Sequence, residues 1–422
     1  MQLIVAPRSS RYCQNDLFLA AARAWKGYRA EQLAAAAAFG AAPLSIAVSE
    51  ILLAIAVASH LVRLIRRQTA LKVPRVIWFW LAWAGLEVAA WLHSPQPLAG
   101  LGEMRHLILI AALFVTLACV RRPEEAVRVW RVILFTATMG SIAVMIGFTT
   151  RLARYRNELA AGGDPAFYLR CGGLLHHWMV YATVEVLVFA ALLEFRAAYA
   201  GESRWLTPAL AIHCLAIVLS LTRSLWIACL IVLALHLAWR RSKWLWAVPV
   251  LPAAVFLLVP GPVHHRLEQT GLSDYYSNAE RVQMLRVGWR MIRQHPIIGV
   301  GPGRVEELYA SYLLPGELLP AYHGHLHNNV VQLAAQFGGF GVAGAVLFLA
   351  VLVRDLARPY SRAHSREQRL LQRCGLAGLS GFMTVGLMDY TYGHSLGLIL
   401  LTFAVISPLT TRVGTEDLHA AR

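Results

Sequence analysis

The 422-residue sequence is poor in charge. Only 15% of its residues are Asp, Glu, Lys or Arg, whereas 58% are hydrophobic. A soluble protein carries about 25% charged and roughly 45–50% apolar residues. This excess of apolar surface cannot all be buried in one or two water-soluble cores, so much of it has to face lipid. The scarcity of charge excludes a soluble enzyme and a disordered chain. A polytopic α-helical membrane protein remains, because lipid leaves only helices and closed barrels as spanning structures.

Cysteine and lysine are also scarce. The six cysteines have spacings that match neither a disulfide framework nor a zinc site. Of the 39 basic residues only Lys26, Lys72 and Lys243 are lysine. Codon bias accounts for such a preference, although particular arginines could serve phosphate, which guanidinium groups bind in pairs of hydrogen bonds. The N-terminus has no signal-peptide layout, so we expect the first spans to act as the targeting signal.

Long apolar runs set the expected fold. Runs of about 17–25 residues predict transmembrane helices. We place them near residues 74–92, 102–120, 126–148, 172–194, 205–221, 224–240, 244–260, 328–353, 371–389 and 394–411. The apolar stretch 32–62 is too long for one untilted span, and Pro43 inside it predicts a helical hairpin. The sequence therefore predicts an all-α polytopic membrane protein with about twelve transmembrane helices.

The basic residues predict the orientation of these helices. They gather in the N-terminal arm and in the loops 63–75, 121–131, 240–243 and 354–369. By the positive-inside rule these segments face the cytoplasm. An arm on that side requires an even number of crossings before residue 63, which agrees with a hairpin in residues 32–62.

The same topology divides the chain into three parts. Residues 1–260 hold the first nine helices, residues 261–327 form a large loop on the outer face, and residues 328–422 hold the last three helices and a cytoplasmic tail. A connection as long as 261–327 is usually functional or disordered. Its amphipathic patterns and balanced charges predict a folded helical cap. A stripe of basic residues in it, Arg286, Arg290 and Arg293, is typical of a helix lying at the lipid headgroups.

Three alternating histidines precede the apolar helix that begins near residue 328. His323, His325 and His327 suggest a metal site, but no carboxylate accompanies them in the sequence and the chain has no Asp-x-Asp pair. We therefore expect no metal and no cofactor. A neutral histidine at a water–lipid boundary can accept a proton, which makes His327 a candidate general base. The alternative is a histidine that merely caps the helix.

Arginines at the outer helix ends are candidates for anion binding. Arg223 lies in the short turn LSLTRSLWIAC, where an arginine among apolar residues is costly and usually has an anionic partner. No acidic residue is nearby in the sequence, so an external anion is expected; snorkelling to the headgroups is the alternative. Arg170 invites the same argument, and Arg281 stands apart from the basic stripe of its helix. Asp389, at another outer helix end, could pair with one of these arginines.

Together these motifs resemble a known family. The spacing of His327-Asn328, nine residues, Gly338, two residues and Gly341 is similar to the signature of bacterial O-antigen ligases. The turn TRSLW and the stretch ERVQMLRVGWRMIRQHPIIGVGPG resemble that group's pattern in the same order. The group also includes O-antigen polymerases and bacterial protein O-oligosaccharyltransferases.

The resemblance implies a metal-independent, GT-C-like glycosyltransferase of the bacterial inner membrane. Such an enzyme moves O-antigen polysaccharide from undecaprenyl diphosphate to a sugar hydroxyl of lipid A–core on the periplasmic face, with inversion; nucleic acid is not an expected partner. The implied roles are general base for His327, orientation or sugar binding for Asn328, and diphosphate binding for Arg223 and Arg281, with Arg170 and Arg304 as further candidates. A polymerase or a protein O-oligosaccharyltransferase would use the same donor. A lipid-linked glycan transporter is the non-enzyme alternative, and it would concentrate polar groups near the membrane midplane rather than at the outer edge.

Overall fold

The computed structural model describes most of the chain. The described residues are 30–67, 71, 73–161, 169–258, 261–269, 276–320, 322–359 and 365–420. The basic N-terminal arm and Lys72, which we used to predict orientation, lie outside these ranges. Within them every regular element is an α-helix or a 3-10 helix and no strand occurs, which confirms the all-α prediction.

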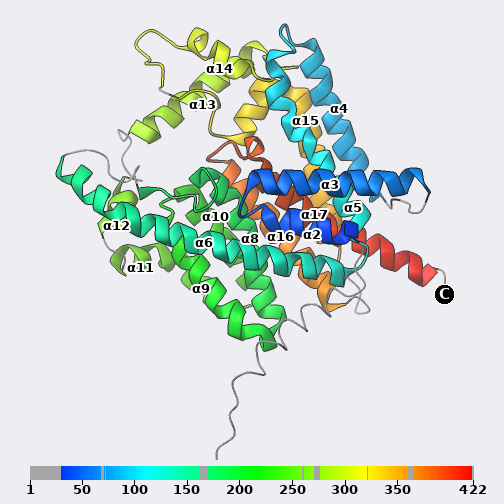
Figure 1. The fold of residues 1–422 in the computed structure, drawn as a ribbon. Coiled ribbons are helices and arrows are strands. Elements are labelled where there is room, and N and C mark those ends of the chain that lie inside the picture. The colour runs from blue at the N-terminus through cyan, green and yellow to red at the C-terminus, as the bar shows by residue number, and fades with distance from the viewer. Residues whose placement is uncertain are drawn as a thin grey trace, which may run out of the picture.

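The first half of the fold is a series of mainly apolar helices (Figure 1). Its elements are α2 (Ala30–Ala41), α3 (Ile46–Ile65), α4 (Val76–His93), η1 (Ala99–Leu109), α5 (Ile110–Cys119), α6 (Pro123–Ala160), α8 (Trp178–Ala198), η2 (Ala200–Glu202), α9 (Ser203–Leu219) and α10 (Arg223–Trp239). The stretch 32–62 is split into α2 and α3 by a turn that contains Pro43, as predicted. Ser45 caps α3 by accepting a hydrogen bond from the Val48 backbone N–H.

The second half carries the outer-face segment and the last long helices. Its elements are η3 (Lys243–Val250), α11 (Leu251–Leu258), α12 (Gly261–Glu268), α13 (Tyr276–Gln294), α14 (Arg304–Leu308), η4 (Tyr309–Tyr312), α15 (Asn329–Ala357), α16 (Arg366–Gly386), η5 (Thr391–Gly393) and α17 (Ser395–Ala420). Helices therefore occur at every position where the apolar runs predicted a span.

The described helices differ in whether they are long enough to cross a membrane. Among the described residues, six helices are long and apolar enough to cross a bilayer: α3, α4, α6, α8, α15 and α17. Another four, α2, α5, α9 and α10, are apolar but shorter. The multi-pass character agrees with the sequence, whereas the count of twelve stays a prediction.

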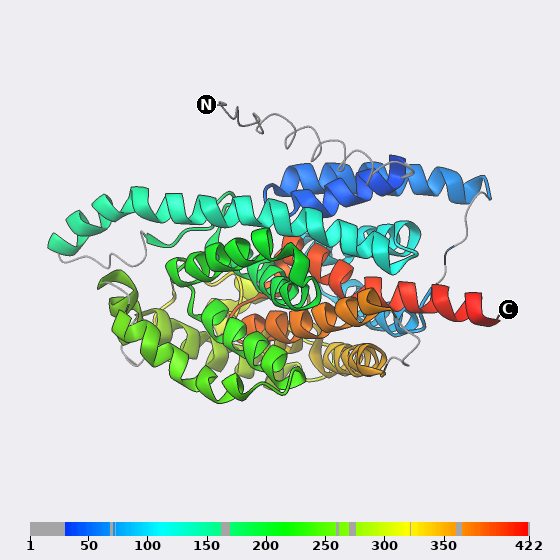
Figure 2. The same cartoon turned by 90° about the horizontal axis from the view of Figure 1, so that it is seen from below.

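Helix α8 is the centre of the bundle. Every residue from Tyr181 to Phe195 is buried, because α9, α10, α16 and α17 pack around it. Figure 2 shows α6 along one side of these helices, with the α2–α3 hairpin on its outer face. In contrast, α3 exposes large apolar side chains, among them Ile51 at 60% and Ile55 at 49%. An apolar surface of this kind is suited to lipid.

Two buried glutamates on α8 are each matched by a histidine. Glu185 Oε1 lies 2.6 Å from His213 Nδ1, and Glu194 Oε1 lies 2.6 Å from His236 Nδ1. Both glutamates are at most 3% exposed. A buried charge is tolerated only when it has partners of this kind. Our expectation that polar groups gather only at the outer edge is therefore too simple.

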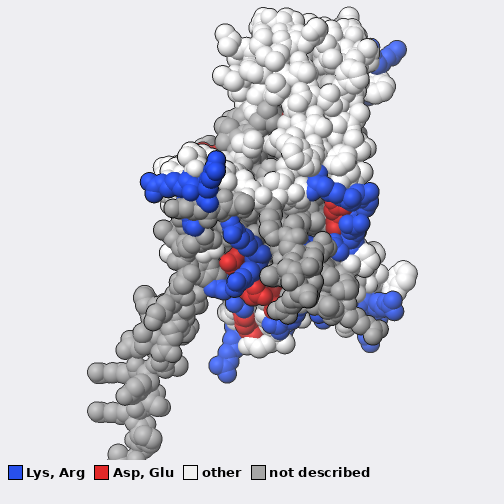
Figure 3. Space-filling model, turned by 90° about the vertical axis from the view of Figure 1, so that its right-hand side faces the viewer, with Lys and Arg blue, Asp and Glu red and all other residues white. Residues whose placement is uncertain are grey.

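Contacts between the predicted cytoplasmic loops bring them to one end of the molecule. Arg75 binds Asp355 through two hydrogen bonds of 2.6 and 3.1 Å. The Arg366 guanidinium lies 4.2 Å from the centre of the Tyr199 ring. Figure 3 views the molecule from the side at which α17 ends, where basic side chains gather with few acidic ones. This clustering agrees with a shared cytoplasmic face for these loops.

The described part of residues 261–327 is helical and packed, while its place on the outer face stays a prediction. Its helices α12, α13 and α14 are followed by η4, and α13 packs on the first turns of α15 (Figure 1). A small core including Met284, Val287 and Tyr309 holds it together. Arg290, which we assigned to a basic stripe facing the headgroups, binds Glu317 at 2.6 and 2.7 Å. The ion pair fixes a loop against α13, so Arg290 is not available to lipid.

Candidate functional site

The histidine at the start of α15 has an unusual backbone. His327 has φ +48°, a left-handed conformation that is uncommon outside glycine, and its N–H donates to His325 Nδ1 at 3.3 Å. Its own Nδ1 lies 3.0 Å from Asp389 Oδ1. Strained residues of this kind persist where the surrounding structure holds them, and they are frequent at functional sites.

Three successive residues fix this junction to the segment between α16 and η5. His327 contacts Asp389, as described. Asn328 accepts from the Val331 N–H at 3.0 Å, which caps α15, and it donates to the Leu387 carbonyl at 2.8 Å. Asn329 donates to Thr391 Oγ1 at 2.7 Å and accepts from the Thr391 N–H at 2.8 Å. The amide of Asn328 therefore joins the start of α15 to the chain that follows α16.

Asp389 corrects the expectation that no carboxylate accompanies the histidines. It follows His327 by 62 residues and is 1% exposed. Burial raises the pKa of the Asp389 carboxyl, but the hydrogen bonds with His327 and His394, and the charge that these imidazoles carry when protonated, outweigh burial and hold this pKa below its ordinary range. Asp389 is therefore a carboxylate at neutral pH. Asp389 also interacts electrostatically with Arg281, one of the arginines expected as its partner, but its carboxylate contacts the His327 side chain directly.

A second histidine and two tyrosines pack around the pair. The ring centres of His325 and His327 are 4.2 Å apart, and Tyr322 and Tyr390 lie against His325. Burial lowers the pKa of His325 to about 3, assisted by the charge of His327. His325 is therefore neutral at physiological pH and cannot compete with His327 for a proton.

By distance alone, the same groups could hold a metal ion. One ligand atom each from His325, His327 and Asp389 lies within 4.8 Å of the others. Two histidines and a carboxylate are ligands that zinc accepts. The direct contact between His327 and Asp389 offers these groups another use, in which the carboxylate orients the imidazole.

Arg281 interacts electrostatically with Asp389 of the His327–Asp389 pair, and two further arginines interact with Arg281. Burial lowers the pKa of the Arg281 guanidinium, Asp389 opposes this effect, and the positive charges of Arg223 and Arg266 lower the pKa further. Arg223 donates to Asn278 Oδ1 at 2.7 Å, and Arg266, which is 2% exposed, donates to Gln269 Oε1 at 2.9 Å. We call Arg223, Arg266 and Arg281 the arginine cluster. Three guanidinium groups that repel one another favour an anion between them.

The other two predicted arginines occupy different surroundings. Arg170 is 9% exposed and its guanidinium lies 5.4 Å from the centre of the Trp178 ring, at the start of α8. Arg304 pairs with Glu307 at 3.3 Å and lines a pocket of about 200 Å³ beside Ser94 and Gly301. Arg223 thus lies near enough to Arg281 to lower its pKa, whereas Arg304 is paired with Glu307.

A kink in α15 explains the glycines of the motif. Gly338 has φ +62°, which interrupts the helix. The carbonyls of Ala335 and Gln336 accept hydrogen bonds from the Val300 and Gly301 N–H groups at 2.8 and 3.0 Å. A side chain at position 338 would approach the facing backbone to within 2.3 Å. The segment after α13 is therefore seated in the kink, and this contact ties the helix that carries Arg281 to the helix that begins beside His327.

Several residues of this site were not expected from the sequence. Arg266 and His394 were not singled out, and Asn329 was overlooked although it follows the predicted pair directly. The available signal was an arginine, a histidine or an asparagine at the end of an apolar helix. Which of these side chains meet depends on packing between α13, α15 and α17, so spacing in the sequence does not reveal it.

Comparison with known protein families finds a match that covers part of the chain. Residues 208–346 match the model of the family described as O-Antigen ligase. The matched range contains all three members of the arginine cluster, His327 and the Gly338 kink, and it ends before Asp389. No curated protein matches the chain.

Proposed function

The match over residues 208–346 supports the O-antigen ligase family for this chain, and on that premise we propose its reaction. Members of the family are glycosyltransferase-like enzymes that act on lipid-linked glycans at a membrane. In this proposal the protein transfers O-antigen polysaccharide from undecaprenyl diphosphate to a sugar hydroxyl of lipid A–core, on the periplasmic face of the inner membrane. The single observation that carries the proposal is the His327–Asp389 pair beside the arginine cluster.

His327 acts as the general base. The Nδ1–H group of His327 donates a hydrogen bond to Asp389 Oδ1. The imidazole therefore keeps a free electron pair on Nε2, which takes the proton of the acceptor hydroxyl. The hydroxyl oxygen attacks the anomeric carbon as the bond from that carbon to the diphosphate breaks. The configuration at this carbon inverts, and no glycosyl-enzyme forms. The Asp389 carboxylate stabilises the imidazolium during the step.

The arginine cluster holds the departing diphosphate. Arg223 and Arg281 carry this role, as expected from the sequence, and Arg266 joins them. Bidentate hydrogen bonds from guanidinium groups to phosphate oxygens are strong, and partial burial strengthens them further. The leaving group needs charge rather than a proton, so no cofactor enters the proposal. Arg170, beside Trp178, and Arg304 are further candidates for contact with the donor.

An O-antigen polymerase or a protein O-oligosaccharyltransferase would use the same donor and the same residues. The difference lies in the acceptor, which is carrier-linked glycan for a polymerase and a protein hydroxyl for a protein transferase. A transporter of lipid-linked glycan is the non-enzyme alternative. The family match favours an enzyme over a transporter.

In vitro transfer tests the proposal. Purified protein is incubated with undecaprenyl-diphosphate-linked glycan and lipid A–core, with and without EDTA. We expect product on lipid A–core in both cases. His327→Ala should lower the rate by about 10²–10⁴ and Arg281→Ala by about 10²–10³. Arg286→Ala, on the same helix but exposed, is the matched control and should transfer normally.

Three outcomes would contradict parts of the proposal. Elongated carrier-linked glycan without product on lipid A–core would indicate a polymerase. Transfer abolished by EDTA would assign His325, His327 and Asp389 to a metal ion instead of a base. Full activity of His327→Ala would remove the base from the mechanism.

A further inference from the structure

A crevice of about 460 Å³ lies next to the catalytic pair, on the α3 side. Residues of α3, α5, α8 and α17 line it together with the end of η1 and η5. Its walls include Ile46, Glu50, Leu53, Val180, His394 and Ser395. None of the three arginines of the cluster is among the lining residues.

His394 connects the crevice with the catalytic pair. It lines the crevice, and its Nε2 lies 3.7 Å from Asp389 Oδ2. The other oxygen of the same carboxylate contacts His327 Nδ1 at 3.0 Å. Two side chains, His394 and Asp389, therefore lead from the crevice to the proposed base His327.

The crevice reaches the lipid-facing surface of the bundle. Ile46, one of its wall residues, is 48% exposed, and Glu50 on the next turn of α3 is exposed as well. Other exposed residues of α3, such as Ile51, are apolar. A ligand that is anchored in the membrane can therefore approach from the side, without leaving the bilayer.

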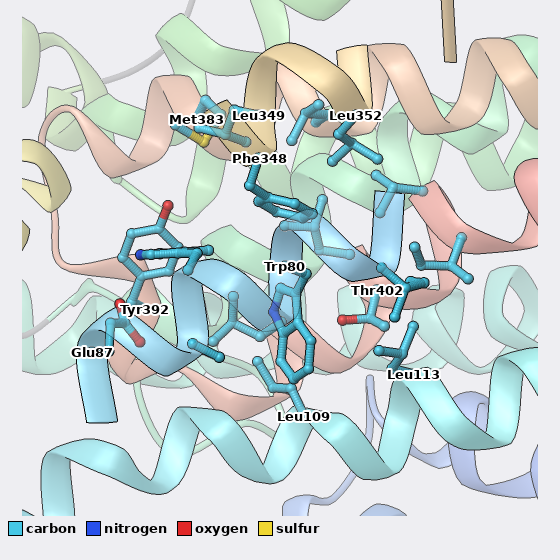
Figure 4. Close-up of a pocket in the computed structure, with 18 residues that line it drawn as sticks. Trp80, Glu87, Leu109, Leu113, Phe348, Leu349, Leu352, Met383, Tyr392 and Thr402 are labelled. Carbon is cyan, nitrogen blue, oxygen red and sulfur yellow. The ribbon is translucent and has the colours of Figure 1, made fainter. Parts of the chain in front are cut away.

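A neighbouring cavity provides a contrast. Figure 4 shows this cavity of about 100 Å³, whose walls are mainly large apolar side chains such as Trp80, Phe348 and Leu352. Leu109 and Tyr392 line both spaces and form a common wall. Glu87 lies in this smaller cavity beside Tyr392 (Figure 4). Of the two, the crevice has the volume for a sugar ring.

The charges of the two sides differ in a way that selects their ligands. The arginine cluster favours the donor diphosphate, whereas a carboxylate at Glu50 repels an anion of that kind. A carboxylate, an imidazole and a hydroxyl, as in Glu50, His394 and Ser395, are suited to hydrogen bonds with sugar hydroxyls. Glu50 in a membrane-facing helix is otherwise costly, which favours a functional role.

We propose that this crevice binds a sugar ring of the membrane-anchored acceptor adjoining the ring whose hydroxyl reacts at His327, with Glu50 accepting hydrogen bonds from the hydroxyls of the bound ring. The donor then occupies the arginine side and the acceptor the α3 side, with the His327–Asp389 pair between them. This inference rests on the proposed function, because it presupposes a glycan acceptor. It adds a specificity-determining residue, Glu50, and a lateral entrance for that acceptor.

Steady-state kinetics with each substrate varied in turn tests the assignment. Glu50→Leu should raise the KM for lipid A–core about tenfold or more, because charge-assisted hydrogen bonds to the sugar are lost. The KM for the donor should stay unchanged, and Glu50→Gln should recover part of the loss. Ala54→Phe, which fills the crevice from the same helix, should also raise the acceptor KM. Glu87→Gln, the matched carboxylate in the smaller cavity, should leave both constants unchanged.

A binding measurement separates failure of the crevice from failure of the proposed function. Lipid A–core is titrated into nanodiscs that contain wild type or Glu50→Leu, without donor. Weaker binding by Glu50→Leu supports the crevice whether or not transfer occurs. Equal binding, or a donor KM that rises as much as the acceptor KM, overturns it. If wild type elongates carrier-linked glycan instead, the ligase assignment fails, and the same comparison is made with the carrier-linked acceptor.

Discussion

Asp389→Asn is the most informative change at the candidate site. The asparagine is nearly the same size as aspartate, and its Oδ1 can still accept from the Tyr390 N–H, which donates to Asp389 at 2.8 Å. The same Oδ1 lies 3.0 Å from His327 Nδ1, so it still accepts from the imidazole and preserves its tautomer. The difference is the charge: a neutral amide does not stabilise the imidazolium that forms when His327 takes the proton of the acceptor hydroxyl.

The expected loss follows from the role of the base. A positioned general base contributes about 10²–10⁴ to the rate, and loss of the carboxylate that stabilises its protonated form removes much of this contribution. Burial of Asp389 at 1% exposure places the change in a low dielectric, where loss of the negative charge destabilises the imidazolium. We therefore expect kcat to fall by about 10²–10⁴, with little change in the KM of the donor, because the arginine cluster is intact.

The assay is transfer from the lipid-linked donor at saturating substrates, with thermal unfolding in detergent as a check on the fold. Asp355→Asn is the matched control, since Asp355 is also ion-paired but binds Arg75 at the opposite end of the bundle. This control should transfer normally even if its unfolding temperature drops. A kcat for Asp389→Asn within tenfold of wild type, in folded protein, would refute the stabilising role of the carboxylate.

Three further predictions concern the frame around the site. Gly338→Ala should lower the unfolding temperature, because φ +62° in a residue with a side chain costs about 1–3 kcal/mol and the new side chain meets backbone. Removing either partner of the buried Glu185–His213 pair should cost about 3–5 kcal/mol; a double-mutant cycle in which the two losses simply add would show that the pair is not coupled. Arg290 lowers the pKa of Glu317 to about 2, so the stability that Glu317 adds is complete above its ordinary pKa of 4.5 and is lost as the pH falls towards 2. The difference in unfolding temperature between wild type and Glu317→Gln should therefore shrink between pH 6 and pH 3, and a constant difference would contradict this.

The helices and the position of His327 could be predicted from the sequence because both depend on local pattern. An apolar run becomes a helix wherever it is placed, and Pro43 interrupts the first run for a local steric reason. His327 stood out because a polar motif precedes an apolar helix directly. The number of crossings could not be settled in this way, since α2, α5, α9 and α10 are apolar but short.

The partners of the site residues depend on tertiary packing instead. Asp389 was noticed as a polar residue at a helix end, yet its partner is a histidine 62 residues earlier, because Asn328 and Asn329 bind the segment that carries it. Arg266 joins the cluster through tertiary contacts, in which Asn278 of α13 donates to the Gln269 carbonyl just after α12 and accepts from Arg223 of α10. Neither contact has a signature in spacing or periodicity.

The left-handed backbone of His327 and the kink at Gly338 have a common effect. Both hold the base and the arginine cluster in separate places. A base that takes a proton and an arginine cluster that attracts an anion would weaken each other if they were free to form hydrogen bonds together. The backbone of His327 at φ +48° turns its imidazole towards Asp389, while the Gly338 kink seats the segment that follows α13 and so fixes Arg281 on its own side. The cost of both distortions is met by the hydrogen bonds of Asn328, Asn329 and the Val300–Gly301 backbone. On this reasoning, loosening the frame should lower the rate before it lowers the affinity for either substrate, since binding needs each side alone and the reaction needs both in register.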